Sequence, residues 1–403
     1  MVLTKKKIFS IFLLIALTFS FITVSQGIGA APHKVKWAGV RESAYGVKMA
    51  DISQFPDPAG WSKAMNSMVS RWQGAVPSAI WLVGEVDYGT KGTTLQFTSP
   101  GGTYDSKIEF DPNQYNGVNH EACLTYFDTH GIKVWLQIEP GFANVPDQIN
   151  AVLKKLGHHK SVLGLAIDVE WYRKASDEGD NAYVTDSEAK NWEDLVKSYD
   201  NNFTLLLKHY DPKYLPPSYR GDIVFCCDDE QNGSLDVFLE EHKEVADRFY
   251  PNPVIYQIGY PSDKAWWGKY DDAPKTMGDA LAAQSNKDQE IGIMWVDFSL
   301  SVLPYIDNGL PSKGPDLNGD GAINMADVIL IAMVFNTTSE NSKYIPAYDL
   351  NGDGAINMAD VIAIASNFNK LVQSTGTSTV TPTSKPTPHQ LTGWIFHRTG
   401  LEL

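Results

Sequence analysis

The sequence has 403 residues, with 48 acidic against 33 basic residues and a formal net charge of −15. Such an acidic chain, without a lysine- or arginine-rich stripe, argues against nucleic acid as a partner, because phosphate backbones are bound by clustered cations. Only three cysteines are present, which excludes a disulfide framework but leaves open one bridge from Cys123 to Cys226 or Cys227.

The N-terminal residues 1–31 have the pattern of a secretory signal peptide. Lysines at positions 5–7 precede an apolar run from Ile8 to Val24, and small residues follow at Gly29–Ala31. An uncleaved membrane anchor is the alternative. We therefore expect an exported protein that has no membrane association once the signal is cleaved.

Residues 32–309 contain apolar, β-branched runs that alternate with helical patterns. The predicted strands begin at Tyr45, Ser78, Ile132, Val162, Phe203, Asp222, Asn252 and Ile291. The predicted helices span Trp61–Trp72, Asn119–Thr129, Pro146–Leu156, Asp186–Tyr199, Leu235–Phe249 and Thr276–Ser285. Eight strands buried on both faces and separated by helices predict an α/β fold, a (β/α)8 barrel of the TIM type. A doubly wound parallel sheet is the alternative.

The segment from Tyr88 to Asn116 is too long for a simple loop. It contains GTTLQFTSP and DSKIEFDP, which predict a β-hairpin inserted after the second strand. On a barrel this insertion would overhang the carboxyl ends of the strands, where active sites lie.

Carboxylates recur at the carboxyl ends of the predicted strands. An unpaired carboxylate is costly to bury, so acids gathered at one end of a barrel indicate a site. The residues are Asp51, Glu85, Asp87, Glu139, Asp168, Glu170, Asp228, Asp229 and Asp297.

The most informative group is LGLAIDVEWY, which contains Asp168 and Glu170. Two residues apart on a strand, they would project to the same face, about 6–7 Å apart at the backbone. Mutual repulsion would leave one ionised and one protonated, as glycoside hydrolysis requires. We expect Glu170 to be the general acid/base, and Asp168 to orient it and hold the negative charge. Glu139 is a candidate third catalytic carboxylate, either as the nucleophile or as a ligand of a sugar hydroxyl. The alternative is a structural salt bridge to Arg173 or Lys208.

Aromatic and polar side chains near the strand ends could bind sugar rings, because flat apolar rings stack on sugars. The pair Trp266–Trp267, in a polar loop, is the best candidate for an exposed stacking platform. The full set of predicted substrate-binding residues is Asp51, Trp171, Tyr256, Gln257, Tyr260, Trp266, Trp267, Trp295 and Asp297.

The DVE at Asp168–Glu170, together with the DIS that begins at Asp51, distantly resembles family 25 lysozyme-type glycosidases and, more loosely, family 18 chitinase-type ones. The resemblance implies a glycosidase barrel in which the glutamate, Glu170, is the proton donor.

The sequence DLNGDGAINMADVI occurs twice, at Asp316–Ile329 and Asp349–Ile362. Oxygen donors alternate in a twelve-residue frame around a glycine, which is the spacing of a calcium loop. An Asx/Gly-rich surface turn is the alternative. The predicted ligands, with alanines contributing backbone carbonyls, are Asp316, Asn318, Asp320, Ala322, Asp327, Asp349, Asn351, Asp353, Ala355 and Asp360.

Two such loops, each followed by an apolar helix, resemble a dockerin module. The resemblance implies two Ca²⁺ ions and docking to a cohesin domain of a scaffold or cell-surface anchor. Partner choice would fall to loop positions ten and eleven, Met325–Ala326 and Met358–Ala359, where many enzyme-borne dockerins carry Ser or Thr.

The predicted organisation is a signal peptide (1–31), a catalytic-type barrel (32–309), a linker (310–315), a dockerin (316–370) and a Pro/Thr/Ser-rich tail (371–403). We expect a secreted, cellulosome-associated glycoside hydrolase that cleaves a polysaccharide, with no cofactor in the barrel. One alternative is a non-catalytic carbohydrate-binding or structural barrel that is docked in the same way. Another is an enzyme acting on a different secreted substrate, such as a peptidase.

Overall fold

The computed structural model describes residues 35–49, 56–114, 118–176, 179, 181–302, 315–317, 322–338, 341, 343–345, 348–350 and 354–368. The predicted signal peptide, most of the linker and the tail lie outside the described residues. So do five predicted site residues: Asp51, Asn318, Asp320, Asn351 and Asp353. Within the described ranges, no helix combines the length and apolar character needed to cross a membrane.

Eight parallel strands form a closed barrel, which confirms the (β/α)8 prediction and rejects the doubly wound sheet. Each strand pairs with its neighbour in the ring, and β1 closes the ring by pairing with both β10 and β2. In chain order the strands are β1 (Val35–Glu42), β2 (Val76–Asp87), β5 (Lys133–Ile138), β6 (Val162–Asp168), β7 (Thr204–Lys208), β8 (Ile223–Cys227), β9 (Val254–Ile258) and β10 (Ile291–Val296).

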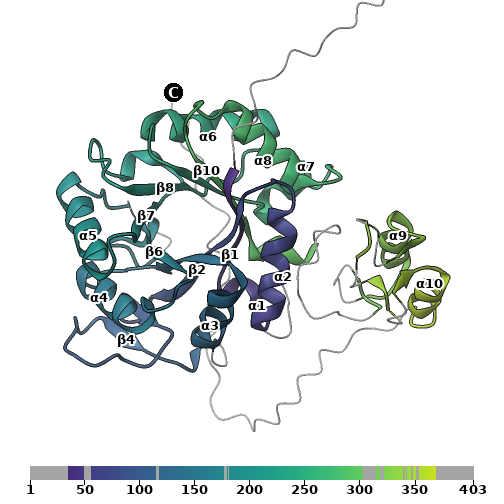
Figure 1. Ribbon diagram of the computed structural model, residues 1–403, viewed down its shortest axis with the longest axis horizontal. Helices are drawn as coiled ribbons and strands as arrows, with labels where there is room; N and C mark the ends of the chain where they lie inside the picture. The colour runs from purple at the N-terminus through teal and green to yellow at the C-terminus, as the bar shows by residue number, and fades with distance from the viewer. Residues whose placement is uncertain are drawn as a thin grey trace, which may run out of the picture. The chain divides into compact units, whose positions relative to one another are not determined.

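Helices surround this ring (Figure 1). The six long ones match the predicted helices to within three residues at each end. They are α2 (Pro58–Val69), α3 (His120–His130), α4 (Val145–Leu156), α5 (Asp186–Tyr199), α6 (Leu235–Phe249) and α8 (Ala273–Gln284). Two short helices, α1 (Ala44–Met49) and α7 (Lys264–Trp267), were not predicted. Between β7 and β8, the described residues form only a 3₁₀ turn, Pro212–Tyr214.

Helix α5 illustrates why these segments are helical. Thr185 caps its N-terminus in a capping box with Glu188, so that orphan backbone N–H groups are satisfied. Ala189, Trp192 and Val196 recur on one face and are buried.

The prediction of a first strand from Tyr45 is wrong, because Ala44–Met49 forms α1 and the first strand is Val35–Glu42. Its sequence, VKWAGVRE, contains a glycine and ends in two charged residues, which obscured the strand pattern. The glycine has a packing reason: a Cβ on Gly39 would lie 1.8 Å from the carbonyl oxygen of Ser78 on β2.

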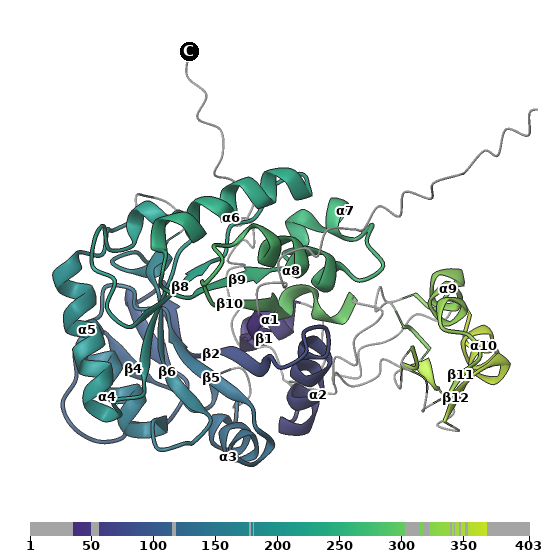
Figure 2. The ribbon, with the colours of Figure 1, turned by 45° about the horizontal axis from the view of Figure 1, so that its top comes forward.

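The insertion after β2 is present, but its predicted pairing is wrong. The antiparallel partner of β3 (Gly92–Leu95) is β2 itself, whereas β4 (Ile108–Phe110) pairs with β3 in parallel. Figures 1 and 2 both show β4 beside α4. There Asn144 donates its backbone N–H to Asp105, and Asp105 donates its own to Asp147.

The inside of the barrel is filled by an apolar layer to which every strand contributes. Trp37 and Trp135 meet edge to face, with ring centroids 5.2 Å apart. The apolar layer consists of Trp37, Ile80, Trp135, Ala166, Leu206, Val224, Cys226, Ile255 and Met294. Cys226 thus faces inwards and Cys227 joins the core outside the ring. All three cysteines are buried and free, so the optional disulfide is not formed.

The C-terminal repeats form two helices, α9 (Met325–Met333) and α10 (Met358–Ala365). A short antiparallel ladder joins β11 (Thr337–Thr338), which follows α9, to β12 (Ala355–Ile356) in the second loop. Apolar residues of both repeats form one small core, which consists of Ile323, Ile331, Val334, Ile345, Tyr348, Ile356 and Ile364.

Truncation of Trp135 tests the apolar layer. Trp135→Ala should lower the free energy of unfolding by about 3–5 kcal/mol, because it opens a cavity inside a closed barrel. Trp135→Phe should destabilise the barrel less, because it keeps most of the side-chain volume, although it loses the indole hydrogen bond to Thr204. Chemical denaturation monitors both variants, and wild-type stability for Trp135→Ala would contradict this description of the core.

Candidate functional site

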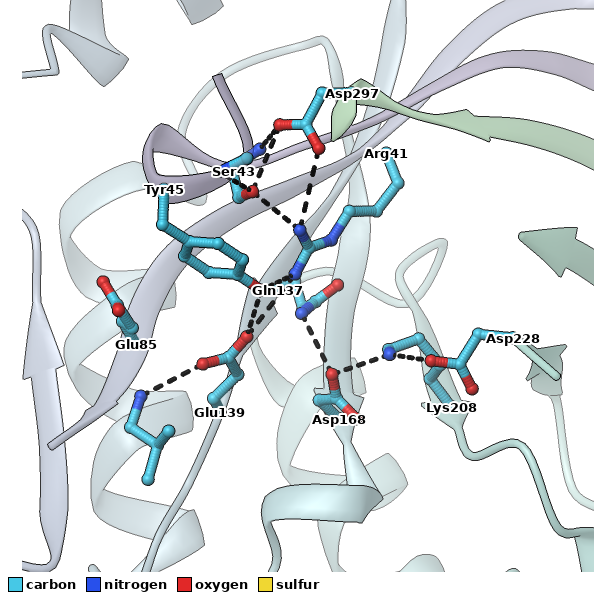
Figure 3. Close-up of polar contacts among 12 residues, drawn as sticks. Arg41, Ser43, Tyr45, Glu85, Gln137, Glu139, Asp168, Lys208, Asp228 and Asp297 are labelled. Carbon is cyan, nitrogen blue, oxygen red and sulfur yellow. Dashed lines mark hydrogen bonds and ion pairs between the residues drawn. The ribbon is translucent and has the colours of Figure 1, made fainter. Parts of the chain in front are cut away.

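A polar layer lies directly above the apolar layer, at the carboxyl ends of the strands (Figure 3). Side chains alternate along a strand, so positions two residues beyond Trp135, Ala166 and Leu206 face the same interior. All of its members have 6% or less of their surface exposed. The polar layer consists of Arg41, Gln137, Glu139, Asp168, Lys208, Asp228 and Gln257.

Lys208 connects two of the buried carboxylates. Its Nζ lies 2.7 Å from Asp168 Oδ2 and also donates to Asp228 Oδ2. Gln137 Nε2 donates to the same Asp168 oxygen at 3.4 Å. Burial raises the pKa of Asp168 to about 7, although the Lys208 ammonium pulls it down. The structural salt bridge left open by the sequence is therefore present, and its cation is Lys208, whereas Arg173 pairs with Glu188.

Glu139 is held by a second group of donors. Tyr45 OH donates to its Oε1 at 2.9 Å, and Arg41 Nη2 to the same oxygen at 3.4 Å. The backbone N–H of Val86 donates to Oε2 at 3.2 Å. A guanidinium, a hydroxyl and an amide thus converge on one carboxylate and fix its position.

Arg41 also links Glu139 to Asp297. Its Nη1 lies 3.9 Å from Asp297 Oδ1 and donates to Ser43 Oγ at 2.7 Å. Ser43 in turn donates its backbone N–H and its hydroxyl to Asp297 Oδ2, at 2.6 and 3.1 Å. Burial raises the pKa of Asp297 to about 6, against the opposing effect of Arg41. The predicted Asp297 therefore lies within the same network as Glu139.

The structure changes the geometry expected for Glu170. β6 ends at Asp168, and Val169–Trp171 form a 3₁₀ turn, so the expectation that Asp168 and Glu170 project to the same face of one strand is wrong. Burial, together with the neighbouring charge of Asp168, raises the pKa of Glu170 to about 8.

The expectation that Trp266 and Trp267 form an exposed platform is wrong. Only 7% and 2% of their surfaces are exposed. Their indole N–H groups donate inwards, Trp266 to Asp263 at 3.0 Å and Trp267 to the carbonyl of Tyr260 at 2.8 Å. These aromatic side chains anchor the chain after β9.

The remaining predicted aromatic residues are also buried. Tyr256 OH lies 3.4 Å from Ser285 Oγ at the end of α8, so this side chain points out of the barrel towards the helices. Trp295 packs edge to face against Trp267. Trp171 lies against Val86 and Ala175, whereas Tyr260 accepts a hydrogen bond from Gln257 at the polar layer.

Sequence analysis missed four members of the site. Arg41 and Tyr45 were missed because the first strand was placed too late, and Gln137 because a lone glutamine gives no signal. Lys208 was considered only as a salt-bridge partner. The sequence did contain a signal for Lys208, since a lysine ends the otherwise apolar run LLLK. In the structure no residue of β7 is exposed.

Four oxygens of the polar layer are buried and accept no hydrogen bond from any described residue. Buried acceptors normally find a donor, so these atoms point to a hydrogen-bonding ligand or to water. They are Gln137 Oε1, Asp168 Oδ1, Asp228 Oδ1 and Gln257 Oε1.

In the C-terminal repeats, the described loop residues have the same arrangement twice. Asp327 accepts from the backbone N–H groups of Leu317 and Asn324, both at 2.8 Å. Asp360 accepts likewise from Leu350 and Asn357, at 2.7 and 2.8 Å. These bonds fold each loop back onto the start of its helix.

The donor set fits calcium. Asp316, Asp327 and Asp360 have at most 1% of their surface exposed, and buried carboxylates need hydrogen bonds and a cation to offset desolvation. In the second loop, Gly354 donates its N–H to Asp349 at 2.7 Å, which tightens the turn around the first ligand. Carboxylate and carbonyl oxygens on one loop suit a hard cation.

Comparison with known proteins identifies this C-terminal segment. Residues 315–369 match the family model for the dockerin type I domain. Two solved structures also match: the C-terminal and N-terminal interface mutants of a type II cohesin–X–dockerin complex from Acetivibrio cellulolyticus. They are 29% and 30% identical over 21% of this chain, with a TM-score of 0.14 for each.

This chain spans about half the length of those solved chains, 51% and 50%. None of the curated proteins matches the chain. The segment 315–369 is therefore a dockerin type I domain, as the two repeats predicted, and the glycosidase resemblance of the barrel stays a prediction.

The raised pKa of Glu170 predicts how barrel stability depends on pH. The folded state holds this proton up to about pH 8, whereas an unfolded glutamate releases it near its ordinary value of 4.5. The free energy of unfolding should therefore fall as pH rises between these values, by up to about 1.4 kcal/mol per unit for one proton. Glu170→Gln should flatten this slope.

Tryptophan fluorescence during chemical denaturation measures the slope, since the dockerin segment contains no tryptophan. Glu244→Gln, on the outer surface of α6, serves as the control. Equal slopes for the wild type and Glu170→Gln would contradict the assignment of a raised pKa to Glu170.

Proposed function

We propose that the barrel is a glycoside hydrolase that acts on a polysaccharide and is docked to a cohesin through its dockerin domain. One observation carries the enzymatic part: the carboxyl end of the barrel holds two glutamates in opposite electrostatic environments. Glu170 has its pKa raised to about 8, whereas Glu139 receives an arginine, a tyrosine hydroxyl and a backbone amide. Glycosidic cleavage needs this combination, one acid and one anion.

In this mechanism Glu170 donates its proton to the glycosidic oxygen as the bond from that oxygen to the anomeric carbon breaks. Glu139 provides the negative charge that opposes the positive charge developing on the sugar ring. A water molecule then adds to the anomeric carbon and gives its proton to a carboxylate of the site, which completes hydrolysis. Arg41 and Tyr45 hold Glu139 in place. The charge of Asp168, only partly offset by its pairing with Lys208, contributes to the repulsion that keeps Glu170 protonated.

The polar layer also suits a polyhydroxylated ligand. Its four unpartnered buried acceptors can receive sugar hydroxyl groups, which are donors as well as acceptors. The net charge of −15 is compatible with a neutral glycan and unfavourable for an acidic one.

For the docking part, we propose that each repeat binds one Ca²⁺ ion and presents one helix to the cohesin. Met325, Ile329 and Met333 lie four residues apart on α9 and are 59%, 56% and 48% exposed. Met358 and Ile362 repeat this on α10, each 57% exposed. Exposed apolar stripes of this kind mark protein interfaces. Ala326 and Ala359, the other predicted contact residues, are half-buried beside them. The dockerin domain supports a proposed location outside the cell, on a cellulosomal scaffold.

Glu170→Gln tests the enzyme. We expect kcat on a natural polysaccharide to fall about 10²–10⁴-fold, because the amide cannot protonate the leaving oxygen. The loss should be much smaller on an aryl glycoside whose phenolate leaves without a proton. The wild-type kcat/KM should decline as pH rises through about 8, where Glu170 loses its proton.

Reducing ends released from cellulose, xylan, mannan, chitin and peptidoglycan give the readout, with Glu244→Gln as the matched control. If the wild type and Glu170→Gln both bind a glycan and neither cleaves any, the barrel is a docked binding module. Equal activity of the two proteins would remove Glu170 from the mechanism.

Introducing a charge on the exposed stripes tests docking. A single Met325→Glu or Met358→Glu substitution should leave cohesin binding within a few-fold, because the repeated helices offer two equivalent orientations. The double substitution should weaken binding at least 100-fold, since a buried unpaired charge is costly at either face. Calorimetry with a cohesin panel measures this, and calcium chelation should abolish binding. Wild-type affinity for the double variant would refute these helices as the interface.

A further inference from the structure

Outside the polar layer, the barrel carries a cluster of two histidines and a glutamate. Glu121 lies on the first turn of α3, and His158 and His159 follow α4 in the connection to β6. The Nε2 atoms of both histidines lie 3.3 Å from Glu121 Oε1. One ligand atom from each residue lies within 4.8 Å of the other two.

The buried member of the cluster is oriented from behind. His159 has 5% of its surface exposed, and its Nδ1 lies 2.8 Å from Asp128 Oδ2. Asp128 is itself fixed, because its Oδ1 accepts from the backbone N–H of Ser161 at 2.7 Å. In the tautomer that carries the proton on Nδ1 and donates it to Asp128, the Nε2 lone pair of His159 faces Glu121. A carboxylate behind a histidine is the usual support of a metal-bound imidazole.

We propose that Glu121, His158 and His159 bind a divalent transition metal ion, with Zn²⁺ as the representative. With the proton on Nδ1, the Nε2 lone pair and the Glu121 oxygen would repel each other, and a metal cation between them would bind both. For bonds of about 2.0–2.1 Å, two ligands of a tetrahedral zinc ion are separated by about 3.3–3.4 Å. The two histidine–glutamate distances, 3.3 Å each, have this value.

The ligand set also indicates the class of ion. Two imidazole nitrogens and one carboxylate oxygen suit zinc, nickel or copper better than calcium, which prefers oxygen alone. Three protein ligands leave a fourth position for water. His158 and Glu121 are 61% and 51% exposed at their side chains, so an ion could reach the site from solvent.

The position of the site indicates a structural role. His158 and His159 precede the first residue of β6, whereas Asp168 ends that strand, so the site lies at the opposite end of the barrel wall from the polar layer. A bound ion would fasten α3 to the connection between α4 and β6. The barrel, for which the sequence predicted no cofactor, would then gain stability from a metal.

Zinc titration of the full chain tests the proposal, with saturating calcium present to occupy the dockerin loops. The wild type should bind one zinc ion. His158→Gln should bind zinc at this site at least tenfold more weakly. Asp128→Asn should weaken binding about 10–100-fold without removing a ligand. His130→Gln, an exposed histidine at the end of the same helix, is the matched control and should bind as the wild type does.

Two readouts decide the outcome, calorimetry and the zinc-dependent rise in Tm of the barrel measured by tryptophan fluorescence. His158 is exposed, so His158→Gln should fold and keep the metal-free Tm. A zinc-dependent rise in Tm that is lost in His158→Gln and Glu121→Gln and kept in His130→Gln supports the site. No zinc uptake by the wild type, or the same uptake by His158→Gln, overturns it.

Discussion

The candidate site depends on an imbalance of buried charge. Among the described residues of the polar layer and its immediate partner Asp297, two cations, Arg41 and Lys208, face four carboxylates, Glu139, Asp168, Asp228 and Asp297. Ion pairing can neutralise only part of this excess in a medium of low dielectric constant. Burial raises the pKa values of Asp168, Glu170 and Asp297, and neighbouring carboxylates raise those of Asp168 and Glu170 further.

Such a layer can exist because of what lies beneath it. Trp37 and Trp135 fill the barrel interior with the rest of the apolar layer, and the closed ladder of eight strands fixes the backbone above. The apolar layer excludes water from below, which strengthens every interaction in the polar layer. The same exclusion raises the free-energy cost of burying unpaired charges, so the packing of the core must offset the destabilisation that the site causes.

The sequence predicted the parts of the fold in which local pattern and tertiary role agree. β6 was recognised because LGLAID is apolar on both faces, and the dockerin segment because one motif is written twice. β1 was missed because three of its residues break the strand pattern. Gly39 allows close strand packing, Arg41 belongs to the site, and Glu42 is a buried charged residue at the strand end. Trp266 and Trp267 appeared exposed because the four-residue helix that buries them is too short to give a period.

The same distinction explains why the carboxylates could be found while their arrangement could not. An acid after an apolar run is visible in the sequence, and Asp168, Glu139 and Asp297 were all located in this way. Whether it meets a cation depends on residues far along the chain: Glu139 meets Arg41 98 positions away. Asp168 meets Lys208, which lies opposite it on the neighbouring strand β7. Glu170 meets none that closely, because the chain turns after Asp168 and carries it out of the strand register. The function of each carboxylate therefore follows from the barrel's closure, which brings these distant strand ends into one ring.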